Sequence, residues 1–228
     1  MIKKFTSPNF NERAGGQKPK LIILHYTGTL TEKEAHDIYM TADKVSPHYM
    51  INKDGDISQY VDEGMRAWHA GKSYWRGDND INSSSIGIEI VNSGHEYDRE
   101  DFPQIQIEKL IELLRDIKNR WGIQNHNILG HSDIAVGRKI DPGEHFPWES
   151  LEAEGIGLLP KPCQAREDLG TFDLLREWGY DPTQPIETLK REFCRHYLRH
   201  SDLNNPDNKD ITAALSSLLH QAQETPIK

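Results

Sequence analysis

The 228-residue sequence has little basic charge and no long apolar segment, and each absence excludes a class of protein. Lysine and arginine number 27 against 36 aspartates and glutamates, which gives a formal net charge of −9 at pH 7. Nucleic acid is therefore excluded as the main partner, because binding phosphates requires a basic surface. No apolar run approaches the roughly 18 residues of a membrane span. The HExxH motif of many zinc peptidases is also missing.

Cysteine is scarce as well. The only two, Cys163 and Cys194, do not form the pattern of a disulfide framework. Cys194 falls on an apolar helical stripe, where we expect a buried thiol. Residues 1–8 contain two lysines without the apolar segment of a signal peptide behind them. Together these features favour a cytoplasmic location, with the periplasm or cell envelope as the alternative if a signal has been removed.

Apolar patterning predicts a β-sheet in the first 160 residues. Strands are expected at 20–27, 48–52, 57–61, 85–92 and 127–131. An Asp54-Gly55 turn joins the second and third strands as a hairpin. In the fourth strand Ile86, Ile88 and Ile90 share one face, so Glu89 points to the opposite face.

Two helices are expected between these strands. Thr31 can cap a helix that runs to about Asp43, with Glu34 completing a capping box. Residues 103–121 carry one continuous apolar stripe. We expect residues 1–19 to be irregular and residues 64–84 to form a long loop, which in a compact domain is usually functional or disordered. Strands mixed with helices indicate an α/β fold with a mixed central β-sheet flanked by helices.

After residue 160 the pattern changes to short helices. Apolar residues mark helices around 172–180, 186–198 and 211–219. The sequence therefore predicts two domains: an α/β domain over residues 1–160 and a small all-α bundle over residues 163–228.

The most informative stretch is residues 130–143, which holds His131, Lys139 and Asp141 among glycines and a proline. His25 ends the strand at 20–27. A lone histidine at a strand end is usually structural, and Asp141 before Pro-Gly can be a plain turn former. Together, however, His25, His131 and Asp141 would make a zinc site whose fourth position stays open for water, as in catalytic sites. Histidine ligands disfavour magnesium and calcium.

Several segments resemble the AmpD/AmiD-type N-acetylmuramoyl-L-alanine amidases, zinc enzymes related to the peptidoglycan-recognition proteins. They are residues 23–27, 85–92, 130–133 and 139–143. The resemblance covers roughly residues 5–160. It implies an amidase fold in which His25, His131 and Asp141 hold one zinc ion. It also implies hydrolysis of the bond between N-acetylmuramic acid, or its 1,6-anhydro form, and the L-alanine of the stem peptide, in cell-wall turnover or recycling.

The partners implied are peptidoglycan fragments or muropeptides. Intact wall, soluble anhydro-muropeptide and lipid-linked precursor all stay open as substrates, and the sequence does not indicate an oligomeric state. The helical tail resembles the peptidoglycan-binding module often fused to these amidases, and a helical extension packed on the catalytic domain is the alternative. A non-catalytic recognition module is the alternative function. It is disfavoured because all three ligands, together with Glu89 and Lys139, are present.

Two charged residues are candidates for catalysis. Glu89 should face a cleft, where it would act as general base; an exposed strand glutamate is the alternative. Lys139 lies two residues before Asp141 and so points the same way in an extended segment. The family uses a lysine here to stabilise the developing oxyanion, although a surface lysine is the alternative. Ser132 and Asp133 could orient the His131 ring or cap the loop.

Aromatic and amide side chains near these motifs are candidates for substrate contact. Residues 68–71, Trp-His-Ala-Gly, resemble a stretch of the family. An aromatic surface suits the apolar face of a sugar, and amides suit acetamido and peptide groups; Arg138 would contact peptide carboxylates. In the alternative, Trp68 is a core residue and His69 forms hydrogen bonds within its loop. The substrate-contact candidates are His48, Trp68, His69, Asn82, Asn92 and Arg138.

Overall fold

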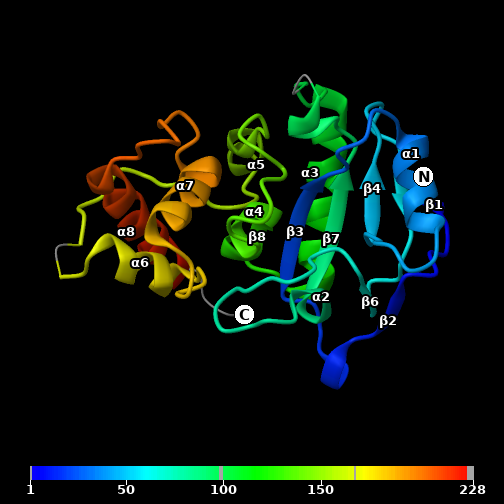
Figure 1. Ribbon diagram of the computed structural model, residues 1–228, viewed down its shortest axis with the longest axis horizontal. Helices are drawn as coiled ribbons and strands as arrows, with labels where there is room; N and C mark the ends of the chain where they lie inside the picture. Colours follow the sequence, from blue (N-terminus) through cyan, green and yellow to red (C-terminus); the bar gives the residue numbers. More distant parts are fainter. Residues whose placement is uncertain (1, 98–99, 167, 225–228) are drawn as a thin grey trace.

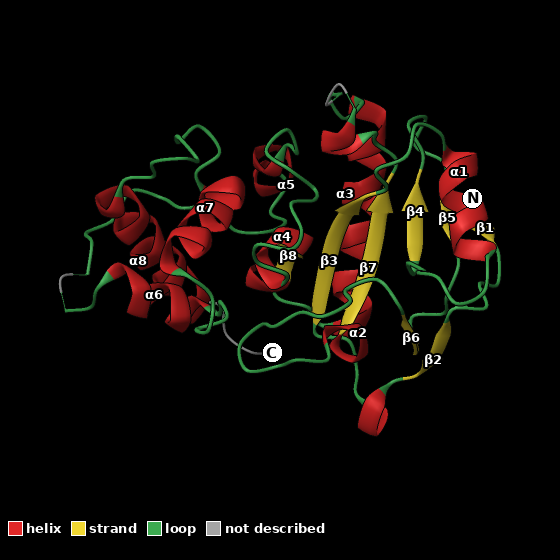
Figure 2. Ribbon diagram, viewed as in Figure 1, coloured by secondary structure: helices red, strands yellow, loops and turns green. Residues whose placement is uncertain are grey.

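The continuous apolar run at residues 21–24 forms most of a strand that lies next to one edge strand of a six-stranded mixed sheet in the computed structural model, which describes residues 2–97, 100–166 and 168–224. The sheet has the order β1-β5-β4-β7-β3-β8, and Figure 2 shows its strands between helices. Strands β4, β7, β3 and β8 are parallel to one another, and β5 returns antiparallel to β4 as the predicted hairpin. The strands are β1 (Lys3–Lys4), β5 (Ile57–Gln59), β4 (Tyr49–Ile51), β7 (Ser85–Ile90), β3 (Leu21–Tyr26) and β8 (Ile128–Gly130).

Alternation along β3 and β7 separates a core face from a functional face. Ile22 and Leu24 of β3 share a core with the three isoleucines of β7 and with the apolar stripe of helix α3 (Gln104–Trp121). Helix α3 lies behind these two strands in Figure 1. His25 and Glu89 are direct partners in the β3–β7 ladder, and both belong to the opposite face. Because the strands are parallel, both residues lie near the same edge of the sheet.

Helix α1 (Glu32–Met40) begins with the predicted capping box. The Glu34 amide donates to the Thr31 hydroxyl at 3.2 Å, and the Thr31 amide donates to the Glu34 carboxylate at 3.2 Å. The helix ends at Met40, before the predicted Asp43. Its buried face, Ala35 and Tyr39, packs in a cluster with Met50 of β4, so α1 covers the outer part of the functional face.

The prediction of irregular structure at residues 1–19 and 64–84 was wrong in part. Strand β1 pairs with β5, and β2 (Phe10–Glu12) pairs with β6 (Met65–Ala67). The two segments also contain helices η1 (Ala14–Gly16) and α2 (Ile81–Ser84). Each of these elements has two to four residues, which is too short to show a sequence period.

The C-terminal helices form the bundle that the sequence predicts, beside the sheet in Figure 1. They share a core with the sheet, because Leu21, Ile23 and Leu129 lie in one apolar cluster with the buried residues of the bundle, including Cys194. The two predicted domains include a few positions that lie outside the described residues, namely 1, 98, 99, 167 and 225–228. The division of the chain at residue 160 stays a prediction. The remaining helices are η2 (Gly94–Glu96), η3 (Asn125–Asn127), α4 (His131–Ile134), α5 (Trp148–Ala153), α6 (Thr171–Trp178), α7 (Ile186–Tyr197) and α8 (Asn208–Glu224).

None of the helices in the described ranges is long and apolar enough to cross a membrane.

Candidate metal centre

Three side chains from three separate segments converge beside the edge of the sheet. His25 lies near the end of β3, His131 begins α4 directly after β8, and Asp141 follows ten residues later in the Gly/Pro loop. The Nδ1 atoms of the two histidines are 2.9 Å apart, and each lies 3.0 Å from Oδ2 of Asp141. All three residues are buried. The structure thus brings together the three predicted ligands, which could hold one metal ion.

The electrostatics of the cluster favour a neutral His25 ring and an ionised Asp141 carboxylate. Burial, reinforced by His131, lowers the pKa of His25 to about 4, although Asp141 opposes this shift. Burial acts to raise the pKa of Asp141, but the charges and hydrogen bonds of the two histidines hold it well below its usual value. Nε2 of His131 lies 3.0 Å from the carbonyl oxygen of Ala70. A carbonyl only accepts hydrogen bonds, so Nε2 carries the proton and Nδ1 presents its lone pair to the centre.

Asp133 caps its helix and does not orient His131. Its Oδ2 accepts a hydrogen bond from the Gly130 amide at 2.8 Å, so the capping alternative is confirmed and the orienting one is wrong. The same carboxylate accepts a hydrogen bond from Tyr180 at 2.7 Å and contacts Nδ1 of His196 at 2.7 Å. Asp133 therefore connects α4 to the C-terminal helices, a role that depends on residues more than 45 positions away.

A cleft of about 790 Å³ opens over the three ligands, and Glu89 and Lys139 both line it. Glu89 is half-buried, and its Oε2 has no hydrogen-bond partner among the described residues. Burial, followed by the nearby charge of Asp141, raises the pKa of Glu89 well above its usual value, while the Lys139 ammonium opposes the shift. The cleft is therefore lined by a carboxylate, one oxygen of which has no hydrogen-bond partner among the described residues, and by a cation, both close to the metal ligands.

Tyr39 is a site residue that the sequence did not indicate. It lines the cleft from α1, and its hydroxyl interacts with the Glu89 carboxylate. The pattern of α1 places Tyr39 on the buried helix face with Ala35. This pattern is typical of a core residue, so nothing in it marks a functional one.

The substrate-contact candidates divide into two groups. Trp68, His69, Asn82 and Arg138 line the cleft. His48 is fully buried, where it accepts a hydrogen bond from the Gly87 amide and contacts Arg13. The side-chain oxygen of Asn92 accepts a hydrogen bond from the Gly94 amide, and its side-chain nitrogen donates one to the Glu100 carbonyl. Neither His48 nor Asn92 lies along the cleft that contains the ligands.

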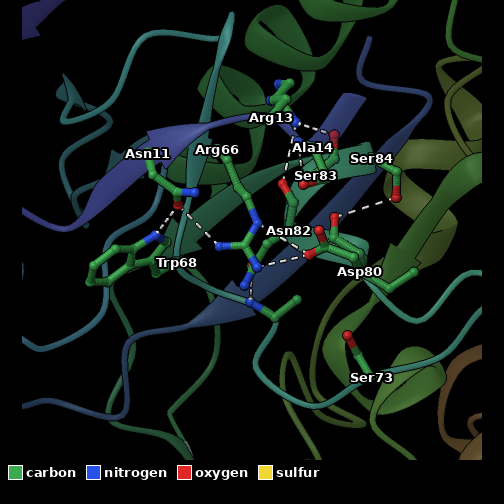
Figure 3. Close-up of polar contacts among 12 residues, drawn as sticks. Asn11, Arg13, Ala14, Arg66, Trp68, Ser73, Asp80, Asn82, Ser83 and Ser84 are labelled. Atoms are coloured by element: carbon green, nitrogen blue, oxygen red, sulfur yellow. Dashed lines mark hydrogen bonds and ion pairs between the residues drawn. The ribbon is translucent and has the colours of Figure 1, made fainter. Parts of the chain in front are cut away.

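A polar network holds the loop that carries Trp68 and His69 (Figure 3). Oδ1 of Asn82 accepts hydrogen bonds from the His69 amide at 3.0 Å and the Ala70 amide at 2.8 Å. Nε1 of Trp68 donates to Oδ1 of Asn11 at 2.6 Å. The Arg138 guanidinium donates to the Ala70 carbonyl at 2.7 Å. Several of the predicted contact residues therefore also shape the cleft wall.

A family model, curated protein sequences and solved structures were compared with the chain, and all three comparisons match it to N-acetylmuramoyl-L-alanine amidases. The model of the N-acetylmuramoyl-L-alanine amidase family matches residues 15–144. The chain is 36% identical over 187 residues to the N-acetylmuramoyl-L-alanine amidase AmiD of Escherichia coli K12, covering 71% of this chain and 67% of that protein. It is 33% identical over 166 residues to the 1,6-anhydro-N-acetylmuramyl-L-alanine amidase AmpD of Enterobacter cloacae, covering 64% and 86%. The crystal structure of AmpDh3 from Pseudomonas aeruginosa in complex with anhydromuramic pentapeptide matches with a TM-score of 0.80 at 30% identity, covering 92% and 94%.

Proposed function

The chain belongs to the N-acetylmuramoyl-L-alanine amidase family, and from this premise we propose that it is a zinc-dependent amidase. Its reaction is hydrolysis of the amide bond between N-acetylmuramic acid, or its 1,6-anhydro form, and the L-alanine of the stem peptide. The convergence of His25, His131 and Asp141 in a cleft that Glu89 also lines carries this proposal.

The donor set of the centre fits zinc. Two neutral imidazole nitrogens and one carboxylate oxygen are common ligands of catalytic zinc. The unprotonated Nδ1 of His131 and Oδ2 of Asp141 both accept, yet they lie 3.0 Å apart, an arrangement that a shared cation stabilises. A zinc ion bound there would lower the pKa of its water to about 7 and polarise the scissile carbonyl.

Glu89 supplies the base in this proposal. Its side chain lines the cleft, where the carboxylate can accept a proton from the attacking water and deliver it to the leaving amine. Its raised pKa makes it a stronger proton acceptor than an exposed glutamate. Tyr39, which interacts with the same carboxylate, restrains its orientation.

Lys139 supplies positive charge for the transition state. Its side chain lines the same cleft, and its charge acts on both Glu89 and His25. The carbonyl oxygen of the substrate gains negative charge as water adds to the amide, and a fixed ammonium stabilises that charge. The energetic advantage arises in the transition state, so Lys139 serves turnover more than ground-state binding.

The cleft suits a muropeptide. Its volume of about 790 Å³ lies within the roughly 300–1,000 Å³ that is usual for small-ligand sites. Trp68 offers an aromatic face for a sugar, and Asn82 and Arg138 offer polar groups at the wall. Because one relative is named for the 1,6-anhydro substrate and another was solved with anhydromuramic pentapeptide, a soluble anhydro-muropeptide is the first substrate to test. The cellular location stays a prediction.

The test is mass spectrometry of the products formed from a defined anhydro-muramyl tripeptide, with and without a zinc chelator. We expect release of free tripeptide that stops on chelation and returns with added zinc. Release that continues in chelator would contradict the zinc requirement. Binding of the muropeptide without cleavage, on this substrate and on polymeric wall, would support the recognition module instead.

A further inference from the structure

His69 lies between a metal ligand and a serine, in a place that the catalytic roles above do not explain. It is buried, with both ring nitrogens engaged. Its Nδ1 lies 3.0 Å from Nε2 of His25, and its Nε2 lies 3.1 Å from Oγ of Ser85. The ring therefore has no nitrogen left for a substrate, although it lines the cleft.

The direction of these hydrogen bonds follows from counting protons. The Ser85 hydroxyl has one hydrogen, which it donates to the carbonyl of Ile81 at 2.6 Å. Its oxygen must then accept a proton from Nε2 of His69. Among the described residues, no carboxylate forms a hydrogen bond with His69. A buried cation without a counter-ion is costly, so the ring is neutral and its Nδ1 is an acceptor.

The same count then fixes the tautomer of His25. Because Nδ1 of His69 accepts, Nε2 of His25 must carry the proton and donate it. The lone pair of His25 is left on Nδ1, the atom that lies 3.0 Å from Oδ2 of Asp141. The chain of hydrogen bonds therefore runs from His25 through His69 and Ser85 to the Ile81 carbonyl.

The His69 ring packs directly against strand β7 at Gly87. Ser85, Gly87 and Glu89 alternate onto the same face of the strand. A Cβ atom on Gly87 would stand 2.3 Å from Cγ of His69, so only glycine leaves room for the ring. The His69 backbone is also fixed, because its amide donates to Oδ1 of Asn82. One face of β7 thus provides the space for the His69 ring at Gly87, the hydrogen-bond acceptor Ser85 and the proposed base Glu89.

We propose that His69 is a positioning residue which, seated on Gly87 and bonded to Ser85, holds His25 in the tautomer whose Nδ1 faces the metal centre. This inference rests on the proposed zinc site. Partners of this kind orient a metal-bound imidazole, and their loss typically lowers metal affinity by about 10–100-fold.

The first test compares zinc affinity, measured by competition with a chromophoric chelator. We expect His69→Ala to lose about 10–100-fold in affinity, and His69→Asn to recover part of it, because its side-chain oxygen can stand near the position of Nδ1. Ser85→Ala should weaken binding, whereas Ser84→Ala should not. Ser84 is an equally buried neighbour whose hydroxyl donates to the same Ile81 carbonyl, and in the described part of the chain it forms no hydrogen bond with His69. Equal affinity in all four variants and the parent would overturn the proposal.

The second test needs neither metal nor turnover. Long-range ¹H–¹⁵N NMR of the metal-free protein reports which nitrogen of His25 carries the proton. We expect Nε2–H in the parent and in Ser84→Ala, and a mixture of tautomers in Ser85→Ala and His69→Ala. A proton on Nδ1 in the parent, or an unchanged tautomer in the variants, would overturn the proposal. If the parent bound no zinc, the proposed function would fail while this readout still decided the role of His69.

Discussion

At the scale of single residues, Glu89 differs from the other strand residues because the structure leaves it a free oxygen. Its Oε2 is buried without a hydrogen-bond partner in the described chain, and its pKa is raised. A buried polar atom without a partner normally costs stability. Its presence beside three metal ligands is therefore better explained by catalysis than by folding.

Replacing Glu89 by glutamine tests this interpretation. Glutamine keeps the shape but cannot accept the proton, so we expect turnover to fall by about 10²–10⁴-fold while zinc content stays unchanged. Turnover is measured by peptide release and zinc by metal analysis of the same sample. Glu112→Gln, on the exposed face of α3, is the control and should retain full activity. A near-normal rate for Glu89→Gln would remove Glu89 as the base.

At the scale of elements, the sequence predicts those whose pattern is long enough to repeat. The apolar run of β3, the alternation in β7, the stripe of α3 and the capping box of α1 all have local signals. The short strands β2 and β6 have none, because their pairing depends on a partner far along the chain. The predicted ligands come together because parallel strands end at one edge. The sequence did not indicate the proposed positioning role of His69. That role depends on Ser85 and on the absence of a side chain at Gly87, and no local sequence pattern reveals either contact.

Glu63 connects helix α3 with strand β4 and should make stability depend on pH. Burial acts to raise the pKa of its carboxyl, but hydrogen bonds from Arg120, Trp121 and Tyr49 outweigh burial and lower it. A pKa lower in the folded than in the unfolded state stabilises the protein above the unfolded value of about 4.3. This contribution is lost as pH falls through the folded pKa.

We therefore expect Glu63→Gln to lower the free energy of unfolding by about 1–3 kcal/mol at pH 7, and by progressively less as the pH falls below about 4. Urea unfolding at several pH values measures the difference between parent and variant. A difference that stays constant across this range would contradict the role assigned to the ionised carboxylate.

At the scale of the whole molecule, the C-terminal helices are joined to the metal centre through Asp133. Asp133 caps the short helix that begins with His131, and it also receives the Tyr180 hydroxyl and contacts His196. The His196 ring stacks at 3.7 Å on both Trp148 and Tyr197. The bundle and the sheet also share an apolar core. The helices thus contribute to stability, whether or not they also bind polymer.

Tyr180→Phe tests this connection with a minimal change. The variant leaves Oδ1 of buried Asp133 without its donor, so we expect a loss of about 1–3 kcal/mol in the free energy of unfolding. Chemical denaturation followed by tryptophan fluorescence measures it. Tyr97→Phe, at an exposed tyrosine, is the matched control and should change little. An unaltered stability for Tyr180→Phe would show that the Tyr180–Asp133 hydrogen bond does not contribute to the connection.

The most direct test of the zinc amidase is a titration of the metal-free protein with zinc, following peptide release from anhydro-muramyl tripeptide. With one centre built from His25, His131 and Asp141, activity should start near zero, rise linearly and stop rising at one zinc per chain. Asp141→Ala should remain inactive at that ratio. Full activity before any zinc is added, or a rise that continues to two equivalents, would contradict a single zinc centre as the origin of the activity.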